Sequence, residues 1–481
     1  MEAKLYINGK WVETTTGSMI DDISPTDHSV VARVHMAGKE EVEAAITAAH
    51  EAFPKWRALL PGEREDYLLK AAAHMKENVE KYAGWLIDES GSCFMKAHDE
   101  VVQSANILLS AAGECRRING GIVPTETPNQ VSTYIRAPLG VVAGIAPFNY
   151  PLLLALGKVA MALAAGNTFV LKPSSNTPLS GVIIAECMDA AGIPVGVFNL
   201  TPGPGSVVGD AFTDDPRVRM VTFTGSTKVG KALAVKCAMG LKRYTLEMGG
   251  KNPLIVLKDY DVDEAVSIAS FGAFFHQGQI CMCTSRIIVE DAIYNAFCET
   301  FAAKARTLRA KDPHEKDAII GPLIDDHQYE VLDRHIRDAV EKGARLLCGG
   351  EHHGNFYEAS VLADVTPDMT VFHEESFGPL TSIIRAKDAK DALALANDSC
   401  YGLSSALLTN DLRFALRYAP EIEAGMVHVG DSTVLGSRQA PFGGVKDSGV
   451  GREGGAFSIE EFTELKWITY QTAPLQYPTD L

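Results

Sequence analysis

Short β-prone runs alternate with helical segments from about residue 140 onward, and this alternation constrains the fold more than any other feature. The runs VVAGIAP, TFVLKP, VFNLT and MVTFT each precede a helix, and these helices are expected to begin near Pro151, Leu179, Ser206 and Thr227. A strand, a helix and a strand at this spacing form a right-handed βαβ unit, so we expect a parallel sheet. The pattern resumes with PLIVL and RIIVE and continues to about residue 450. The sequence therefore predicts an α/β protein with a second α/β domain in its C-terminal half.

The N-terminal part of the chain has a different pattern. LYINGKWV places Asn8 and Gly9 between alternating apolar residues, which favours a type I′ hairpin. Apolar residues at helical spacing then recur over 42–53 and again over 68–82. The segment 120–138, GGIVPTETPNQVSTYIRAP, interrupts the pattern with Gly, Pro and Thr. We expect helices after the hairpin and an extended arm at 120–138.

Composition and charge exclude several classes of protein. The chain has 481 residues, 46% of them hydrophobic, and a formal net charge of −17, which disfavours binding to nucleic acid or to an anionic membrane. Its nine cysteines are scattered and odd in number, as is typical of a reducing cytoplasm rather than of a disulfide scaffold. The first ten residues have no signal-peptide core, and the apolar segment 152–165 contains Lys158 and is too short to span a bilayer. We therefore expect a cytoplasmic protein without membrane or nucleic-acid partners.

The segment GQICMCTSR carries two cysteines, Cys281 and Cys283, separated by one residue. A structural zinc site draws its ligands from two clusters, and the sequence has no second such pair, so no metal is expected. A permanent disulfide between residues i and i+2 is strained, and most cysteines are simply small buried hydrophobes. Gly278 instead permits a close backbone approach in a loop, and a helix beginning there would make a nearby thiol more acidic. We interpret the segment as the site of a candidate nucleophile.

Two polar residues are candidate partners for this thiol. Glu247 ends a predicted strand and is followed by two glycines, so it can face a cleft at the carboxyl edge of the sheet, although most single glutamates are merely solvated. Asn149 follows a strand and precedes Pro151 at a helix start. It is either a helix cap or an amide donor to an oxyanion.

Three loops after predicted strands have features of a phosphate site. GPGSVVG contains Gly203 and Gly205, FTGSTKVG places Ser226 at a helix start, and VLKPSS ends a strand with Lys172. Glycines, helix N-termini and lysines at such positions bind phosphate groups. Three such loops in one sheet indicate a dinucleotide.

Seven motifs, in order and at approximate spacing, resemble those of the aldehyde dehydrogenase superfamily: FNYP, LKPSS, FTGST, LEMGGKNP, GQICMCTSR, EESFGP and PFGGVKDSGVGREGG. The resemblance covers nearly the whole chain. It implies a Rossmann-like cofactor domain (1–119 and 139–249), an α/β catalytic domain (250–450), and a small β oligomerisation arm with a C-terminal tail (120–138 and 451–481). It also implies a homodimer or a homotetramer.

The resemblance assigns roles to individual positions. Cys281 matches the catalytic thiol, Glu247 the general base and Asn149 the oxyanion amide. Glu464, in FTELK, matches a second carboxylate that relays protons. The positions that match cofactor contacts are Phe148, Lys172, Ser174, Ser175, Gly205, Gly225, Ser226, Glu375 and Phe377.

These roles imply oxidation of an aldehyde to a carboxylic acid with NAD or NADP, through a thiohemiacetal and a thioester on Cys281. Glu247 favours water over coenzyme A as the acceptor, because only hydrolysis needs a base there. Many NAD-preferring relatives have Glu at the position of Ser175, where a carboxylate would repel a 2′-phosphate. Because Ser175 removes this repulsion and Lys172 attracts the phosphate, we predict that NADP is accepted, alongside NAD.

The substrate is the least constrained part of the resemblance. HQGQICM is similar to benzaldehyde-, vanillin- and salicylaldehyde-type enzymes, KPSS to lactaldehyde-type enzymes, and Cys283 to succinate-semialdehyde enzymes. Carboxylate-binding members often carry Arg at the position of Gly157. We expect an aromatic or medium aliphatic aldehyde, with succinate semialdehyde or lactaldehyde as alternatives.

Three further hypotheses are weighed against this expectation. Cys283 is a candidate redox switch through a reversible disulfide with Cys281. A catalytically inactive structural protein on the same fold is the non-enzymatic alternative. A phosphorylating enzyme with His276 as its base fits the Glu247 motif poorly.

Overall fold

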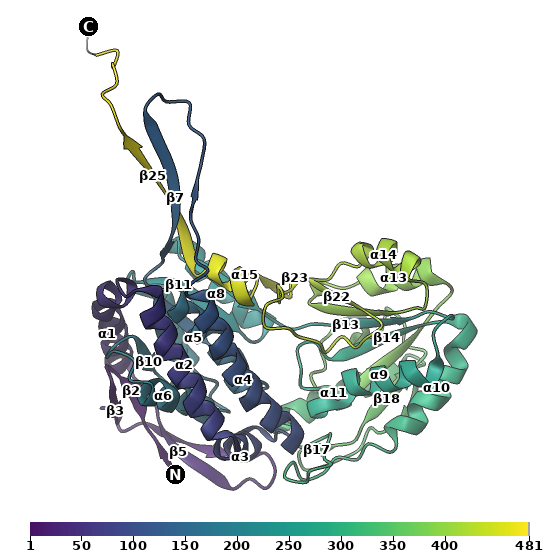
Figure 1. The fold of residues 1–481 in the computed structure, drawn as a ribbon. Helices are drawn as coiled ribbons and strands as arrows, with labels where there is room; N and C mark the ends of the chain where they lie inside the picture. The colour runs from purple at the N-terminus through teal and green to yellow at the C-terminus, as the bar shows by residue number, and fades with distance from the viewer. Residues whose placement is uncertain (480–481) are drawn as a thin grey trace.

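Two sheets with parallel cores, each covered by helices on both faces, make up most of the molecule, and a β arm projects from the first of them (Figure 1). This computed structural model describes residues 1–479. The expected α/β class is confirmed. No helix within this part of the chain has the length and apolar character needed to cross a membrane.

The first sheet contains the predicted βαβ units. Its strand order is β24-β12-β11-β8-β9-β10-β2-β3, and the five strands from β12 to β10 run parallel. These five are β8 (Val141–Ile145), β9 (Thr168–Lys172), β10 (Phe198–Leu200), β11 (Val218–Thr224) and β12 (Arg243–Glu247). Their carboxyl ends therefore lie along one edge of the sheet, where α/β proteins bind ligands.

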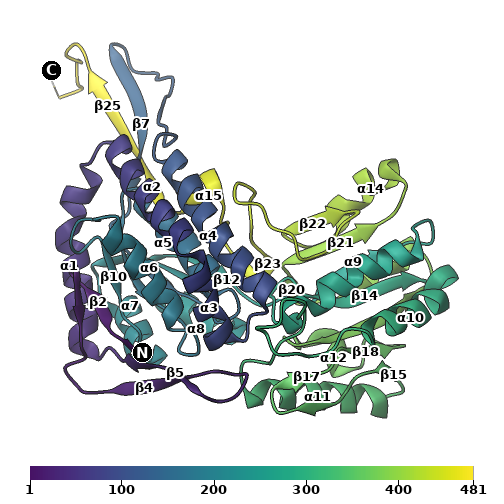
Figure 2. The same cartoon turned by 60° about the horizontal axis from the view of Figure 1, so that its bottom comes forward.

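Helices cover both faces of the first sheet (Figure 2). One face carries α2 (Pro61–Glu77), α3 (Val79–Ser90), α4 (Phe94–Glu114), α5 (Pro151–Ala164) and α6 (Leu179–Ala190), and the other α1 (Lys39–Arg57), α7 (Asp210–Asp214) and α8 (Thr227–Met239). The expected starts at Pro151, Leu179 and Thr227 are confirmed. Near Ser206 the chain instead forms a π-helical turn, Gly205–Gly209, that leads into the short α7.

The N-terminal segment contains more strand than the sequence predicted. The hairpin of β2 (Leu5–Ile7) and β3 (Lys10–Val12) is confirmed: Asn8 and Gly9 have φ of 51° and 73°, the left-handed values of a type I′ turn. It extends the first sheet, because β2 pairs antiparallel with β10. The prediction missed a separate three-stranded sheet of β1 (Glu2–Ala3), β4 (Met19–Ile23) and β5 (Val30–His35).

The second sheet has the order β15-β18-β19-β14-β13-β21-β22 and is parallel except for the edge strand β15. Its strands are β13 (Asn252–Val256), β14 (Thr284–Glu290), β15 (Arg345–Cys348), β18 (Ser360–Ala363), β19 (Leu380–Ala386), β21 (Ser404–Leu408) and β22 (Met426–Val429). Helices α9 (Val262–Phe274) and α10 (Asp291–Ala305) pack on one face. The other face carries α11 (Asp326–Glu341), α12 (Thr370–His373), α13 (Ala389–Asn397) and α14 (Leu412–Tyr418).

After the second sheet the chain returns to the first. The short strands β20 (Tyr401–Gly402) and β23 (Val445–Lys446) pair with each other, and β16 (His352–His353) pairs with β17 (Phe356–Tyr357). Strand β24 (Gly449–Val450) then joins β12 antiparallel, and α15 (Gly455–Glu461) packs against α4 and α5. The loop between β22 and β24 thereby lies over the carboxyl end of β12.

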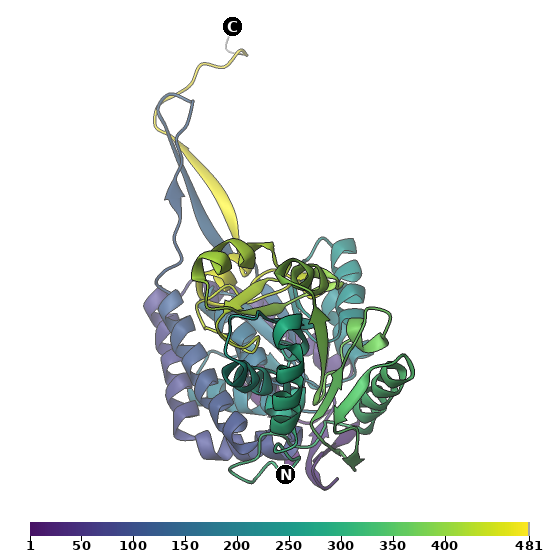
Figure 3. The same cartoon turned by 90° about the vertical axis from the view of Figure 1, so that its right-hand side faces the viewer.

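The arm is a three-stranded antiparallel sheet that projects away from both halves (Figure 3). It consists of β6 (Gly121–Ile122), β7 (Gln130–Pro138) and β25 (Thr463–Gln471), so the expected pairing of 120–138 with a C-terminal strand is present. Trp467 donates from Nε1 to Ser132 Oγ across the arm at 2.8 Å. Trp467 is 70% exposed, and Leu465 and Tyr470 are also exposed.

Candidate active site

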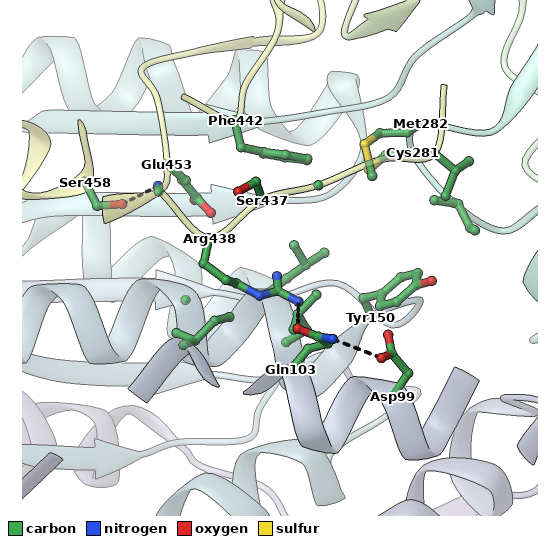
Figure 4. A pocket seen from close by; sticks show the side chains of 18 of the residues that line it. Asp99, Gln103, Tyr150, Cys281, Met282, Ser437, Arg438, Phe442, Glu453 and Ser458 are labelled. Atoms are coloured by element: carbon green, nitrogen blue, oxygen red, sulfur yellow. Dashed lines mark hydrogen bonds between the residues drawn. The ribbon is translucent and has the colours of Figure 1, made fainter. Parts of the chain in front are cut away.

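A pocket of about 310 Å³ contains Cys281 and lies where both halves of the molecule contribute side chains (Figure 4). Helices α4 and α5 line one wall, and the loops around Cys281 and residues 434–442 line another. The apolar lining residues are Ile107, Leu153, Leu154, Met161, Phe271, Phe275, Ile280, Met282, Val434 and Phe442. A pocket of this size, with a largely apolar lining and few polar groups, is typical of a small-molecule site.

Cys281 is held in a tight loop between α9 and β14. His276, Gln277 and Gly278 all have positive φ, at 51°, 45° and 68°. A Cβ on Gly278 would lie 2.2 Å from the carbonyl oxygen of Gly378, so glycine is required there. Asn252 Nδ2 donates to the carbonyl oxygens of Cys281 and Cys283, at 2.8 and 2.9 Å, and fixes the loop to the end of β13.

No helix begins beside Cys281, because strand β14 follows the loop, as the β-prone run RIIVE indicated. No helix dipole therefore acidifies the thiol. Burial raises the pKa of Cys281 to about 12, and the nearby carboxyl groups of Glu247 and Glu375 add to this effect. The thiol is protonated at rest, so its attack on a substrate requires loss of the proton to a base.

Asn149 follows β8 and is buried. It is not the helix cap, because Tyr150 occupies that position and Glu100 Oε1 accepts from the first free N–H groups of α5, those of Leu152 and Leu153, at 3.0 and 3.1 Å. The carbonyl oxygen of Asn149 accepts from Lys96 Nζ at 2.7 Å and from His276 Nε2 at 2.8 Å. Within residues 1–479 its side-chain amide has no hydrogen-bond partner, so the amide is free to donate to a ligand.

Glu247 ends β12 as predicted and is 4% exposed. Its Oε2 has no hydrogen-bond partner among the described residues, and Gly443 approaches so closely that a Cβ there would lie 2.8 Å from Oε1. Burial raises the pKa of Glu247 well above its usual value, Glu453 raises it further, and Lys158 and Arg452 oppose the shift. A buried carboxyl with a raised pKa and an unused oxygen is suited to proton transfer at neutral pH.

The structure does not bring Glu464 to this site. Glu464 is exposed near the start of β25, opposite Ala137 in the arm. The carboxylate beside Glu247 is Glu453, which lines the pocket and forms an ion pair with the fully buried Lys158. Glu453 is the Glu of the GREGG segment, so the sequence motif already contained this carboxylate.

The predicted adenosine-side residues gather at the ends of β9, β10 and β11. Lys172 ends β9, and burial without an ion-pair partner among residues 1–479 lowers its pKa to about 8. Ser174 and Ser175 follow it. Ser175 is exposed, and Ser174 Oγ accepts from the N–H of Asn176 at 3.1 Å. A buried lysine beside an exposed serine is a donor set that fits a ribose or a phosphate group.

The three glycine and serine candidates differ in their surroundings. Gly205 begins the π-helical turn, and a Cβ there would meet nothing within 4 Å. Gly225 donates from its N–H to the carbonyl oxygen of Glu247 at 3.1 Å, and a Cβ there would strike the ring of Phe223. Ser226 caps α8 through its Oγ and is exposed, which leaves the N-terminus of α8 accessible to an anion.

The predicted nicotinamide-side residues do come together. Glu375 Oε1 accepts from the N–H of Gly250 at 3.1 Å, and a Cβ on Gly249 would lie 2.3 Å from its Oε2. Burial raises the pKa of Glu375 to about 7. The rings of Phe148 and Phe377 meet edge to face, with centroids 5.6 Å apart. These donors and surfaces fit a dinucleotide that extends from Lys172 to the neighbourhood of Cys281.

Cys283 points away from the pocket that contains Cys281. Its Sγ donates to the carbonyl oxygen of Ala273 at 3.4 Å, and the side chain borders a separate small cavity beside Glu375. Both thiols are free, and burial raises the pKa of Cys283 to about 12.

Several pocket residues lay outside every motif considered in the sequence. Asp99 and Gln103 come from α4, and Arg438 comes from the loop that precedes the PFGG segment. Arg438 lies 335 residues from Gln103 in the chain, so no local spacing could have joined it to α4. Arg438 Nη2 donates to Gln103 Oε1 at 3.0 Å, and Gln103 Nε2 donates to Asp99 Oδ1 at 3.0 Å.

Comparison with known proteins identifies the family. Residues 11–468 match the model of the aldehyde dehydrogenase family. A salicylaldehyde dehydrogenase of Pseudomonas putida is 40% identical over 99% of this chain and 100% of its own length. The NADP(+) succinate-semialdehyde dehydrogenase of Escherichia coli K12 is 38% identical, covering 96% of each chain.

The fold agrees with this match. The crystal structure of a salicylaldehyde dehydrogenase from Pseudomonas putida G7, complexed with salicylaldehyde, superimposes with a TM-score of 0.97 at 39% identity and covers 99% of this chain and 100% of the other. The chain therefore belongs to the aldehyde dehydrogenase family.

Proposed function

We propose that the protein oxidises an aromatic aldehyde to the carboxylic acid, with NAD or NADP as the oxidant. The observation that carries this proposal is the pocket itself: the Cys281 thiol borders a largely apolar cavity whose wall includes the rings of Tyr150, Phe271, Phe275 and Phe442. Aromatic and aliphatic side chains favour an aromatic or medium aliphatic body.

The arrangement supports a two-stage reaction. The Cys281 thiol loses its proton to solvent and the thiolate attacks the aldehyde carbon. The resulting oxyanion accepts hydrogen bonds from the free amide of Asn149 and from the N–H of Cys281. One such donor is typically worth about 10²–10³ in kcat. The bound cofactor supplies the acceptor for the hydride that leaves the thiohemiacetal. Glu247 then takes a proton from water, and the resulting hydroxide cleaves the thioester on Cys281.

Burial of Glu247 serves this second stage. Its raised pKa makes the carboxylate a stronger base than a solvated glutamate, and Oε2 is not engaged by any described residue. The ion pair of Glu453 and Lys158 lies beside it and replaces Glu464 as the candidate partner in proton transfer.

The cofactor proposal rests on the loop after β9. Lys172 carries a charge that no described carboxylate neutralises, and Ser175 places no negative charge nearby. A 2′-phosphate would meet a cation and no anion, so NADP is accepted as well as NAD. The succinate-semialdehyde dehydrogenase of Escherichia coli, an NADP(+) enzyme by name, supports this choice.

Succinate semialdehyde is the second candidate substrate, because the succinate-semialdehyde dehydrogenase of Escherichia coli acts on it and because Arg438 enters the pocket.

We further propose a homodimer or homotetramer, which is supported by the exposed Leu465, Trp467 and Tyr470 of the arm. The proposed division is a cofactor domain (1–119 and 139–249), a catalytic domain (250–450) and an arm with tail, in a cytoplasmic enzyme.

The test is NAD(P)H formation at 340 nm with benzaldehyde, vanillin, salicylaldehyde, hexanal, lactaldehyde and succinate semialdehyde, each with NAD and with NADP. Cys281→Ser serves as the matched control. Turnover that depends on Cys281 and is strongest with the aromatic aldehydes supports the proposal. Turnover confined to short aliphatic aldehydes contradicts the substrate assignment, and absence of turnover with every aldehyde contradicts the enzymatic function.

A further inference from the structure

Arg438 places a cation in a pocket that is otherwise largely apolar. Figure 4 shows its side chain extending from the loop between β22 and β23 toward Gln103 on α4. Both residues line the same cavity as Cys281. A guanidinium presents five N–H donors, and only Nη2 has a protein acceptor among residues 1–479, the Oε1 of Gln103 at 3.0 Å.

The charge of Arg438 is only indirectly compensated. No described carboxylate forms an ion pair with it, and Asp99 is connected to it through the neutral amide of Gln103, which donates to Asp99 Oδ1 at 3.0 Å. Burial lowers the pKa of Arg438, whereas Asp99 and Tyr150 act in the opposite direction. The other acid in the lining, Glu453, is engaged by Lys158. A partly desolvated cation without a direct anionic partner favours an anion from outside.

The opposite wall leaves room for such a ligand. Gly157 on α5 lines the pocket, and a Cβ built there would meet only Ile107, at 3.9 Å. The apolar lining accommodates the body of an aldehyde while Cys281 and Arg438 border the same cavity. A single ligand can therefore contact the thiol with its aldehyde carbon and the guanidinium with a second polar group.

We propose that Arg438, oriented by Gln103, binds an oxyanion carried by the substrate, so that the preferred substrates are aldehydes with a carboxylate or sulfonate remote from the aldehyde group. The inference rests on the proposed aldehyde oxidation and specifies its substrate class. The planar guanidinium offers paired donors to either oxyanion. Asp99 weakens the attraction through its own negative charge.

The test compares charged and uncharged aldehydes of one shape. The ratio of kcat/KM for 4-formylbenzoate to that for benzaldehyde is measured in the wild type, in Arg438→Gln and in Arg413→Gln, and 4-formylbenzenesulfonate is measured in the same way. Arg413 is an exposed arginine on α14, outside the pocket, and serves as the matched control. Succinate semialdehyde against butanal repeats the comparison on an aliphatic body.

We expect each ratio to fall by about 10-fold or more in Arg438→Gln, chiefly through KM of the charged aldehyde, and to stay unchanged in Arg413→Gln. Asp99→Asn should raise the ratio several-fold. A fall for only one of the two oxyanions identifies which one the site accepts. If Arg438→Gln lowers the values for charged and neutral aldehydes equally, Arg438 is merely structural and the inference is overturned. The inference is also overturned if the wild type discriminates against the charged aldehydes, although aldehyde oxidation then stands. If no aldehyde reacts, the proposed function itself is wrong.

Discussion

Replacing Lys96 by Met should destabilise the protein far more than breaking an ion pair of similar length at the surface. Lys96 Nζ donates to Glu100 Oε2 at 2.5 Å, to Ser92 Oγ at 2.8 Å and to the carbonyl oxygen of Asn149 at 2.7 Å. The side chains of Lys96 and Glu100 are both fully buried. The substitution leaves the Glu100 carboxylate without a cation in a site closed to water.

The magnitude follows from burial. Removing one partner of a buried ion pair costs about 3–5 kcal/mol, whereas an exposed pair contributes about 0.2–1 kcal/mol. The matched control is Lys236→Met, which removes an ion pair to Asp210 of 2.7 Å whose side chains are 44% and 50% exposed. The assay is equilibrium unfolding in urea, followed by circular dichroism, and the midpoint should fall clearly for Lys96→Met and little for Lys236→Met.

A double variant separates charge from packing. Lys96→Met with Glu100→Gln removes both charges and keeps an acceptor for the N–H groups of Leu152 and Leu153, to which Glu100 Oε1 is bonded. It should therefore be more stable than Lys96→Met alone. Equal midpoints for Lys96→Met and Lys236→Met, or a double variant less stable than Lys96→Met, would refute the reasoning.

Four further predictions concern catalysis, the cofactor and redox control. Ser175→Glu should raise KM for NADP at least about 10-fold and leave KM for NAD within about 3-fold, because the new carboxylate repels the 2′-phosphate; equal changes would contradict this. Since the pKa of Lys172 is lowered to about 8, its charge is present below that pH and lost above it, so the ratio of KM for NADP to KM for NAD should rise between pH 7 and 9.5; a flat ratio would count against a role for Lys172. Since the pKa of Glu247 is raised, the carboxylate is lost as pH falls, so kcat should decline on the acid side at a pH well above the usual carboxyl range, and the decline should vanish in the slow turnover of Glu247→Gln. If Cys283 is a redox switch, Cys283→Ser should abolish the recovery by thiols of peroxide-inactivated Cys281; unchanged recovery would exclude the switch.

The strand-end residues could be predicted from sequence because parallel strands share an edge. Asn149, Lys172 and Glu247 each occur at or just after a β-prone run, and β8, β9 and β12 belong to one parallel core, so their carboxyl ends had to lie along the same edge. Cys281 was found through its own loop signal, Gly278. These inferences needed only local patterns and one topological rule.

The parts that sequence missed depend on pairing across long stretches of chain. Strand β4 contains Asp21 and Asp22, residues depleted in strands, and it is a strand through its antiparallel pairing with β5, in which Asp22 lies opposite Ala32. Glu453 reaches Glu247 only because the chain returns from the second sheet and β24 joins β12. Glu464 lies eleven residues further along the chain, in the arm. No local sequence pattern shows whether Glu453 or Glu464 is the carboxylate beside Glu247.

The wall of the pocket illustrates the same limit. Gln103 lies in the middle of a helix whose spacing predicts only burial, and Arg438 lies in a loop without regular structure. Their hydrogen bond joins residues 335 positions apart. The residues proposed to select the substrate therefore come together only through tertiary contacts, whereas the reacting groups lie in motifs that can be recognised in the sequence.

The most direct test of the account is a rapid-mixing measurement on Glu247→Gln with an aromatic aldehyde and saturating NAD(P). Because Cys281 makes the attack and Glu247 serves the hydrolysis of the thioester, we predict a burst of about one NAD(P)H per active site, followed by turnover at least about 100-fold slower than in the wild type. Cys281→Ser should show neither burst nor turnover. Wild-type turnover by Glu247→Gln, or loss of the burst together with the turnover, would contradict the separation of the two roles.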